Sequence, residues 1–152
     1  MLFSAIKKGL FMDIRKLITS GAFFLMVHCS SVAHELDKVT EKQLFQNYAL
    51  AMCLASEFKG STVYSDAGLA LNGYRESGKL GLSVYSDAYK LLQKWQQKPY
   101  VSHSGATMKV ARCIDFHYSQ DIADLFQKND PCAQEKNWRD KALFKVRCPS
   151  LN

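Results

Sequence analysis

The chain has 152 residues, 47% of them hydrophobic, and carries a formal net charge of +6. Nucleic-acid-binding proteins usually gather their basic residues into a patch, whereas Lys and Arg are spread singly along this chain. The charge therefore does not indicate a nucleic acid partner, and the length is that of one small domain.

The start of the chain has the pattern of a secretory signal peptide. Basic residues precede an uncharged apolar run over 17–27, and Ser31-Val32-Ala33 supplies the small residues that come before a cleavage site. We therefore predict export and cleavage after Ala33, so that 1–33 is the signal peptide. Translation from either Met1 or Met12 would produce such a signal.

Two membrane-bound alternatives are weaker. The apolar run of 11 residues is too short for a membrane anchor, since a spanning helix needs about 20. A lipid anchor at Cys29 would be preceded by the bulky His28, where a small residue is expected. Cleavage leaves a single domain over 34–152 with 16 basic and 13 acidic residues, a net charge of +3, and no membrane association.

This domain has helical patterns and almost no strand signal. The first helix is expected to begin at Thr40, an N-cap residue, and to end at Gly60, which can adopt a left-handed conformation. The second is expected over 62–77, ended by Gly78. The positions expected to be buried are Leu44, Tyr48, Ala51, Met52 and Ala55 in the first helix, and Val63, Tyr64, Ala67, Ala70, Leu71 and Tyr74 in the second.

A third helix is expected from Ser83, as its N-cap, to Pro99, because the residue before a proline avoids the helical conformation. A polar loop over 100–107 then leads to a fourth helix over 108–128, with a local N-cap and a kink at Ser119. The expected inward positions are Tyr85, Ala88, Tyr89, Leu92 and Trp95 in the third helix, and Val110, Cys113, Ile114, His117, Ile122, Leu125 and Phe126 in the fourth.

A short C-terminal helix is expected to open at Asp130-Pro131 and to run through Trp138 to about Phe144, because proline favours the first helical position. The predicted fold class is therefore all-α. The domain is a small helical bundle of four main helices plus this short helix, braced by disulfides.

Four cysteines follow the signal peptide: Cys53, Cys113, Cys132 and Cys148. An even number in an exported chain implies two disulfides, for which three connectivities exist. Cys132 and Cys148 close a short loop, which leaves Cys53 to pair with Cys113. The chain-entropy relation gives stabilisations of about 3 kcal/mol for the short loop and about 4 kcal/mol for the long one.

Cys113 and His117 lie four residues apart on one helix face, as a metal-binding pair or an activated thiol would. An exported cysteine with a partner is oxidised, however, and a disulfide sulfur is neither a nucleophile nor a thiolate ligand. We therefore predict no catalytic residue, no metal site and no cofactor. His117 is expected to be hydrogen-bonded at the edge of the core, and Asp115 to pair locally.

Four blocks of sequence, taken in order, resemble the type VI secretion amidase immunity proteins. They are Tyr48-Ala-Leu-Ala-Met-Cys-Leu-Ala-Ser56, Asn72-Gly-Tyr74, Ser104-Gly105 and Arg112-Cys-Ile-Asp-Phe-His-Tyr-Ser119. The resemblance runs from about Leu44 to Leu125, and the extension that contains Cys132 and Cys148 departs from the family pattern.

This resemblance implies a periplasmic all-helical inhibitor, usually a homodimer, of a peptidoglycan amidase with a papain-like cysteine active site. Such inhibitors block the substrate groove partly with a loop between helices, for which only the segment from Tyr100 to Thr107 qualifies. Its expected contacts are Tyr100, Ser102, His103, Ser104, Gly105 and Thr107. Lys90 and Lys94 on the third helix form a second candidate contact face. A plain connection between two helices would also explain the polar loop, and an ordinary solvated face would also explain the two lysines.

Two other functions stay open from the residues alone. A secreted hydrolase would use His103 or His117 with a carboxylate, but no recognised nucleophile or metal motif accompanies them. A periplasmic helical binding module would share the fold and differ only in its partner. An adjacent gene that encodes a papain-like amidase would favour the immunity protein.

Overall fold

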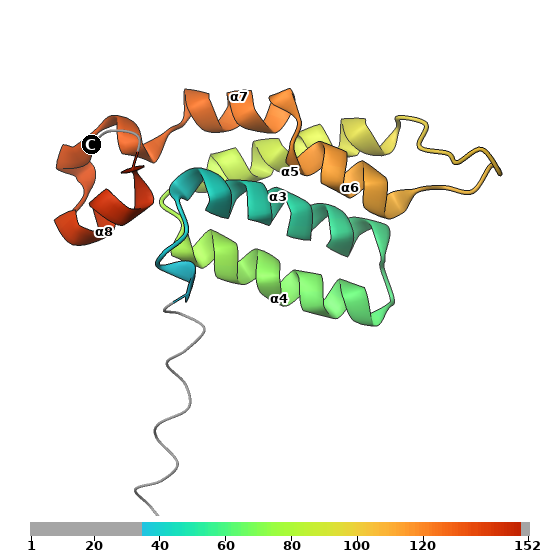
Figure 1. Ribbon diagram of the computed structural model, residues 1–152, viewed down its shortest axis with the longest axis horizontal. Helices are drawn as coiled ribbons and strands as arrows, with labels where there is room; N and C mark the ends of the chain where they lie inside the picture. The colour runs from blue at the N-terminus through green and yellow to red at the C-terminus, as the bar shows by residue number, and fades with distance from the viewer. Residues whose placement is uncertain (1–34, 150–152) are drawn as a thin grey trace, which may run out of the picture. The chain divides into compact units, whose positions relative to one another are not determined.

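A computed structural model of the chain describes residues 35–149, so the predicted signal peptide and the alternative lipid anchor at Cys29 lie outside the described residues. This part of the chain is all-α, as predicted, and none of its helices is long and apolar enough to span a bilayer. The helices are α3 (Glu41–Glu57), α4 (Thr62–Ser77), α5 (Leu82–Gln96), α6 (Lys109–His117), α7 (Gln120–Lys128) and α8 (Lys141–Arg147), with 3-10 turns at Pro131–Ala133 and Glu135–Asn137 (Figure 1).

The ends of the first two helices follow the predicted local signals. Thr40 is the N-cap of α3, and its hydroxyl accepts a hydrogen bond from the backbone N–H of Gln43. The Gln43 side chain accepts one from the Thr40 N–H in return, which completes a capping box. Gly60 has a φ of 80° in the turn after α3, and Gly78 is the C-cap of α4. These three predictions are confirmed.

Three boundaries differ from prediction. The N-cap of α5 is Gly81 rather than Ser83. The predicted local N-cap at Ser119 is confirmed, since its hydroxyl accepts a hydrogen bond from the Ile122 N–H, but it starts a separate helix, α7, where a kink in one helix was predicted. The C-terminal segment forms the two 3-10 turns before α8, since the indole N–H of Trp138 donates to the carbonyl of Pro131 and folds the chain back on itself.

The core forms around α3, which Figure 1 shows between α4 and the layer of α5, α6 and α7. Aromatic rings fill its centre, and those of Tyr48 and Tyr85 meet edge to face with centroids 4.6 Å apart. The buried residues of this core are Phe45, Tyr48, Ala49, Met52, Cys53, Val84, Tyr85, Ala88, Leu92, Cys113, Phe116, Ile122 and Phe126.

Five residues predicted to face inward are between 42% and 51% exposed: Val63, Tyr64, Tyr89, Val110 and Ile114. α4 packs mainly on α3, so only Ala67 of α4 is buried. In α6, the bond from Cys113 to α3 turns Phe116 and His117 inward and leaves Val110 and Ile114 outside. The helical period predicts which apolar side chains share one face of a helix. The neighbouring helices decide which of those side chains are buried.

Both predicted disulfides are present. Cys53 of α3 is bonded to Cys113 of α6 across 60 residues, with the Cα atoms 5.4 Å apart and both residues fully buried. Cys132 is bonded to Cys148 across 16 residues. The second bond lies in a separate small cluster with Trp138, Leu143 and Phe144, within residues 130–149, which we call the C-terminal module.

A buried ion pair attaches the C-terminal module to the start of α3. The Arg147 guanidinium lies 3.4 Å from a carboxylate oxygen of Glu41, and the two side chains are 2% and 1% exposed. Burial raises the pKa of Glu41, while a hydrogen bond from the Lys79 N–H and the charge of Arg147 oppose the rise. The module is therefore held to the bundle by a desolvated charge pair.

Candidate functional site

The predicted polar loop between α5 and α6 is a β-hairpin rather than an irregular connection. Val101 and Thr107 form an antiparallel bridge. The Ser102 N–H donates to the carbonyl of Ala106 (2.8 Å), and the Met108 N–H donates to that of Tyr100 (2.8 Å). Figure 1 shows this segment extending beyond the ends of the helices. We call residues 100–108 the hairpin.

The tip of the hairpin is a tight turn that depends on one glycine. The Gly105 N–H donates to the carbonyl of Ser102, and Gly105 has a φ of 82°. A three-residue loop that ends in a left-handed residue is a common hairpin connection, and glycine adopts it without strain. The Ser102 hydroxyl also accepts from the Ala106 N–H (3.1 Å), so the turn is fixed by its own hydrogen bonds.

Tyr100 holds the base of the hairpin to α6. Its hydroxyl donates to the Asp115 carboxylate (2.8 Å), and its ring lies 5.5 Å from the Arg112 guanidinium. Burial, together with the hydrogen bond to Asp115 and the charge of Asp115, raises the pKa of Tyr100, so the hydroxyl stays protonated and can donate. Asp115 pairs locally, as predicted, and its role is to position the hairpin.

A buried ion pair lies under the same base. Arg112 donates to the Glu57 carboxylate (2.8 Å), and the two side chains are 9% and 8% exposed. Arg112 also donates to the carbonyl of Lys98, two residues before the hairpin, and Lys109 donates to the carbonyl of Glu57. The end of α3, the end of α5 and the start of α6 are thereby joined where the hairpin leaves the bundle.

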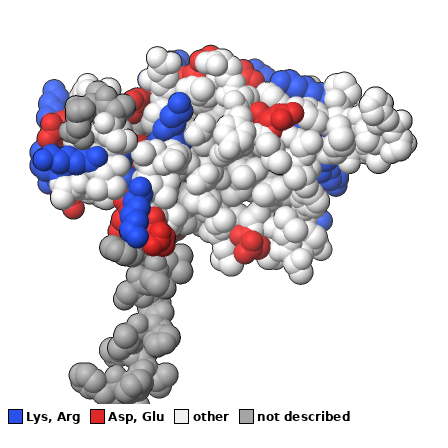
Figure 2. All heavy atoms as spheres, viewed as in Figure 1, with Lys and Arg blue, Asp and Glu red and all other residues white. Residues whose placement is uncertain are grey.

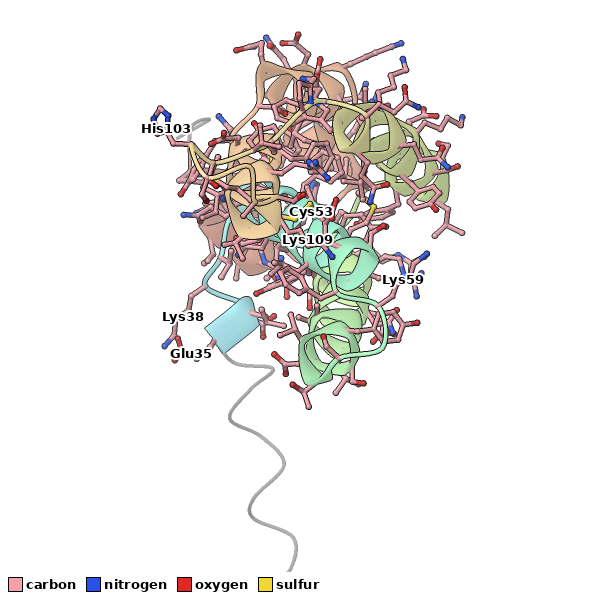
Figure 3. The ribbon with its side chains drawn as sticks, turned by 90° about the vertical axis from the view of Figure 1, so that its right-hand side faces the viewer. Glu35, Lys38, Cys53, Lys59, His103 and Lys109 are labelled. Carbon is pink, nitrogen blue, oxygen red and sulfur yellow. A yellow bond between two sulfur atoms is a disulfide. The ribbon has the colours of Figure 1, made fainter. Side chains whose placement is uncertain are left out.

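The six predicted contact residues divide into exposed and half-buried ones. His103, Ser104, Gly105 and Thr107 are exposed, whereas Tyr100 and Ser102 are half-buried and make the internal contacts described above. In Figure 3 the His103 side chain projects at the edge of the molecule. In Figure 2 the protruding hairpin carries no charged side chain. The hairpin therefore presents a small, uncharged tip on a fixed support.

The second predicted contact face lies on the outer side of α5. Lys90 and Lys94 are both exposed. Lys90 forms a surface ion pair with Asp87 (2.8 Å) whose side chains are 66% and 50% exposed, a kind of pair that contributes little to stability. The structure places both lysines apart from the hairpin contacts and joins them to no other predicted site residue.

The cysteine–histidine pair on α6 has a structural arrangement. The Cys113 sulfur is in the disulfide, and Nδ1 of His117 donates to the carbonyl of Gln46 (2.8 Å) at 8% exposure, as expected for a histidine at the core edge. Within residues 35–149, no three His, Cys, Asp or Glu side chains gather in a way that could hold a metal ion.

Residues 43–126 match the Tai4 family model, described as type VI secretion system (T6SS), amidase immunity protein. No curated protein matches the chain. Among solved structures, a similar chain belongs to the effector–immunity system Tae4/Tai4 from Salmonella typhimurium, selenomethionine variant, with 25% identity and a TM-score of 0.56. The match covers 60% of this chain and 90% of that one. The matched residues include the hairpin and the Cys53–Cys113 bond, but not the C-terminal module.

Proposed function

The chain belongs to the Tai4 family of type VI secretion system amidase immunity proteins, and from this premise we propose that its hairpin occludes the active site of a cognate amidase. It is an immunity protein of an amidase effector system and not an enzyme. The proposed partner is a peptidoglycan amidase with a papain-like cysteine active site, and inhibition is stoichiometric.

The observation that carries this proposal is the preformed hairpin. Its turn is closed by its own hydrogen bonds, and its base is tied to α6 by Tyr100 and Asp115. A loop that is already ordered loses little conformational entropy on binding, so more of its contact energy remains as affinity. The uncharged tip, with the Ser104 hydroxyl, the His103 ring and the bare backbone of Gly105, suits a narrow groove that holds a peptide.

Charge at the tip is expected to weaken inhibition. The double variant His103→Glu/Ser104→Glu should raise the concentration needed for half-inhibition of the cognate amidase by at least about tenfold, since two carboxylates would be desolvated in the complex. The measurement is release of peptidoglycan fragments by the amidase at increasing ratios of inhibitor.

Ala133→Glu, on the exposed surface of the C-terminal module, is a control for added negative charge. The far-ultraviolet circular dichroism spectrum should not change in either variant. Unaltered inhibition by the tip variant would exclude the hairpin as the occluding element. Binding of the amidase without any loss of cleavage by the unmodified protein would instead favour a binding module.

We propose Lys90 and Lys94 as a second and weaker contact with the amidase. The variant Lys90→Glu/Lys94→Glu should lower the association rate at low ionic strength and have little effect at high salt, because surface charges act over about 10 Å at 0.1 M salt. Stopped-flow fluorescence at two salt concentrations measures this. Equal rates for the variant and the unmodified protein at low salt would remove α5 from the interface.

The proposed location is the periplasm, after cleavage behind Ala33, with residues 34–152 as the mature domain. The two disulfides support an oxidising compartment. N-terminal sequencing of periplasmic material tests the cleavage site. The mature protein is proposed to be a homodimer, as the family resemblance implies, and sedimentation velocity of the purified domain tests that state.

A further inference from the structure

A groove lies over α3 between α4 and α5, with a volume of about 430 Å³. Its floor is largely apolar and includes Met52 and Leu71. One exposed aromatic ring stands on each rim, Tyr64 from α4 and Tyr89 from α5, and each is 47% exposed. Exposed aromatic rings beside an apolar floor are typical of surfaces that bind another molecule.

The charged groups of the groove all have one sign. Lys59 and Arg75 line it, and none of the described lining residues is acidic. The only hydrogen bond that the Arg75 side chain makes within residues 35–149 goes to the amide oxygen of Asn72. The groove thus offers two cations that no carboxylate of its own lining neutralises.

Two tyrosine hydroxyls add to this polarity. Tyr48 and Tyr85 line the groove, and each is only 6% exposed. Among residues 35–149 no hydrogen bond joins either hydroxyl to another group, and neither oxygen is one of the fully buried unpaired atoms, which are Nε of Arg112 and Nε of Arg147, so both hydroxyls keep contact with the solvent of the groove. Burial, with the charges of Glu41 and Tyr48, raises the pKa of Tyr85 to about 12, against the effect of Arg75. The hydroxyl therefore stays protonated and can donate to an anion.

The distance between Lys59 and Arg75 distinguishes a small organic acid from an extended peptide as the ligand. Lys59 precedes the first turn of α4, and Arg75 lies in its last turn. A rise of 1.5 Å per residue places these ends roughly 20 Å apart. An extended peptide covers this distance with about six residues at 3.3 Å each. A small organic acid reaches only one cation, whereas a peptide segment reaches both and places apolar side chains on the floor between them.

We propose that this groove binds a short peptide segment of a partner protein, in which apolar residues lie between two carboxylates. The carboxylates would meet Lys59 at one end and Arg75 at the other, where the Tyr48 and Tyr85 hydroxyls supply further donors. Figure 3 shows Lys59 and His103 projecting on different sides of the molecule, so the groove is separate from the tip of the hairpin. The site does not depend on the role proposed for the hairpin.

Titration of the ¹⁵N-labelled mature protein with the peptide acetyl-Glu-Leu-Phe-Leu-Leu-Glu-amide tests the site. Chemical-shift changes are expected for groove residues, and binding should weaken roughly fivefold when Lys59 and Arg75 are both replaced by Gln, since two exposed ion pairs are lost. Two single variants, Lys128→Gln and Asn129→Asp, serve as controls. Both positions lie outside the groove lining, so each variant should bind the peptide as the unmodified protein does.

Two further peptides separate charge from apolar contact. The same sequence with Gln in place of Glu should bind about as weakly as the charged peptide binds to the double variant, and the same sequence with Ser in place of Leu and Phe should not bind. Phenylpropionate, a single apolar acid, should bind more weakly than the peptide. Absence of shifts at millimolar peptide, shifts confined to the hairpin, or equal binding of the Gln and Glu peptides would overturn the proposal.

Discussion

Replacing Cys53 and Cys113 together with alanine is expected to lower the free energy of unfolding by about 4 kcal/mol. The bond closes a separation of 60 residues, and its removal returns to the unfolded chain the entropy of that loop. Both cysteines are fully buried in the main core. Urea unfolding of the oxidised protein and of the variant, followed by circular dichroism, measures the difference.

The variant Cys132→Ala/Cys148→Ala is the matched control. Its loop of 16 residues predicts a loss of about 3 kcal/mol, and the affected cluster is the C-terminal module rather than the main core. The two variants should therefore differ in which tryptophan changes its environment first during urea unfolding. This should be Trp95 of the bundle in the Cys53/Cys113 variant and Trp138 of the module in the Cys132/Cys148 variant. A loss below about 1 kcal/mol in the Cys53/Cys113 variant would contradict a bracing role for the bond.

Arg112→Leu is expected to cost about 3–5 kcal/mol and to loosen the hairpin, because it leaves the Glu57 carboxylate buried without a cation. The remaining partner of that carboxylate is the Gln96 amide at 3.3 Å, which is a weaker donor. The contact to the Lys98 carbonyl, two residues before the hairpin, is lost as well. Urea unfolding reports the stability, and the inhibition assay reports the hairpin.

The double variant Glu57→Gln/Arg112→Leu separates charge burial from packing. Removing both charges of a buried pair is often nearly neutral, so the double variant should be more stable than Arg112→Leu alone. Lys90→Leu breaks an exposed ion pair and should change the stability by less than about 1 kcal/mol. If the single and double variants at Arg112 were equally stable, the charge of Glu57 would not be the cause of the loss.

Local signals in the sequence were enough to place most helix ends. Thr40 caps α3, Gly60 adopts the left-handed conformation after it and Gly78 is the C-cap of α4. Ser119 starts a new helix as its hydroxyl predicts. The same reasoning failed at Ser83, because Gly81 occupies the N-cap position two residues earlier and makes no side-chain bond. Short-range preferences thus predict the start of a helix well where a side chain forms the cap, as at Thr40 and Ser119.

The burial predictions failed where tertiary contacts decide. Val110 and Ile114 share a helical stripe with Cys113, but the bond to Cys53 sets the rotation of α6 and brings Phe116 inward instead. The pairings Arg112–Glu57 and Arg147–Glu41 join residues 55 and 106 positions apart. Single charged residues carry no sequence signal for such partners.

The hairpin was predicted as a loop, although its sequence contained a usable signal. Val101 and Thr107, two β-branched residues, flank a short polar segment with Gly105 near its end. This pattern is typical of a hairpin with a three-residue turn. The bridge consists of a single residue pair, so the strand pattern in the sequence is short.

The two disulfides connect the four cysteines of the described residues in consecutive order, first with second and third with fourth. A chain that emerges with its N-terminus first exposes Cys53 and then Cys113 before Cys132 or Cys148 becomes available. An oxidase that acts on thiols in the order of their emergence therefore forms the native bonds directly. Maturation by this route needs no thiol–disulfide exchange to correct the connectivity.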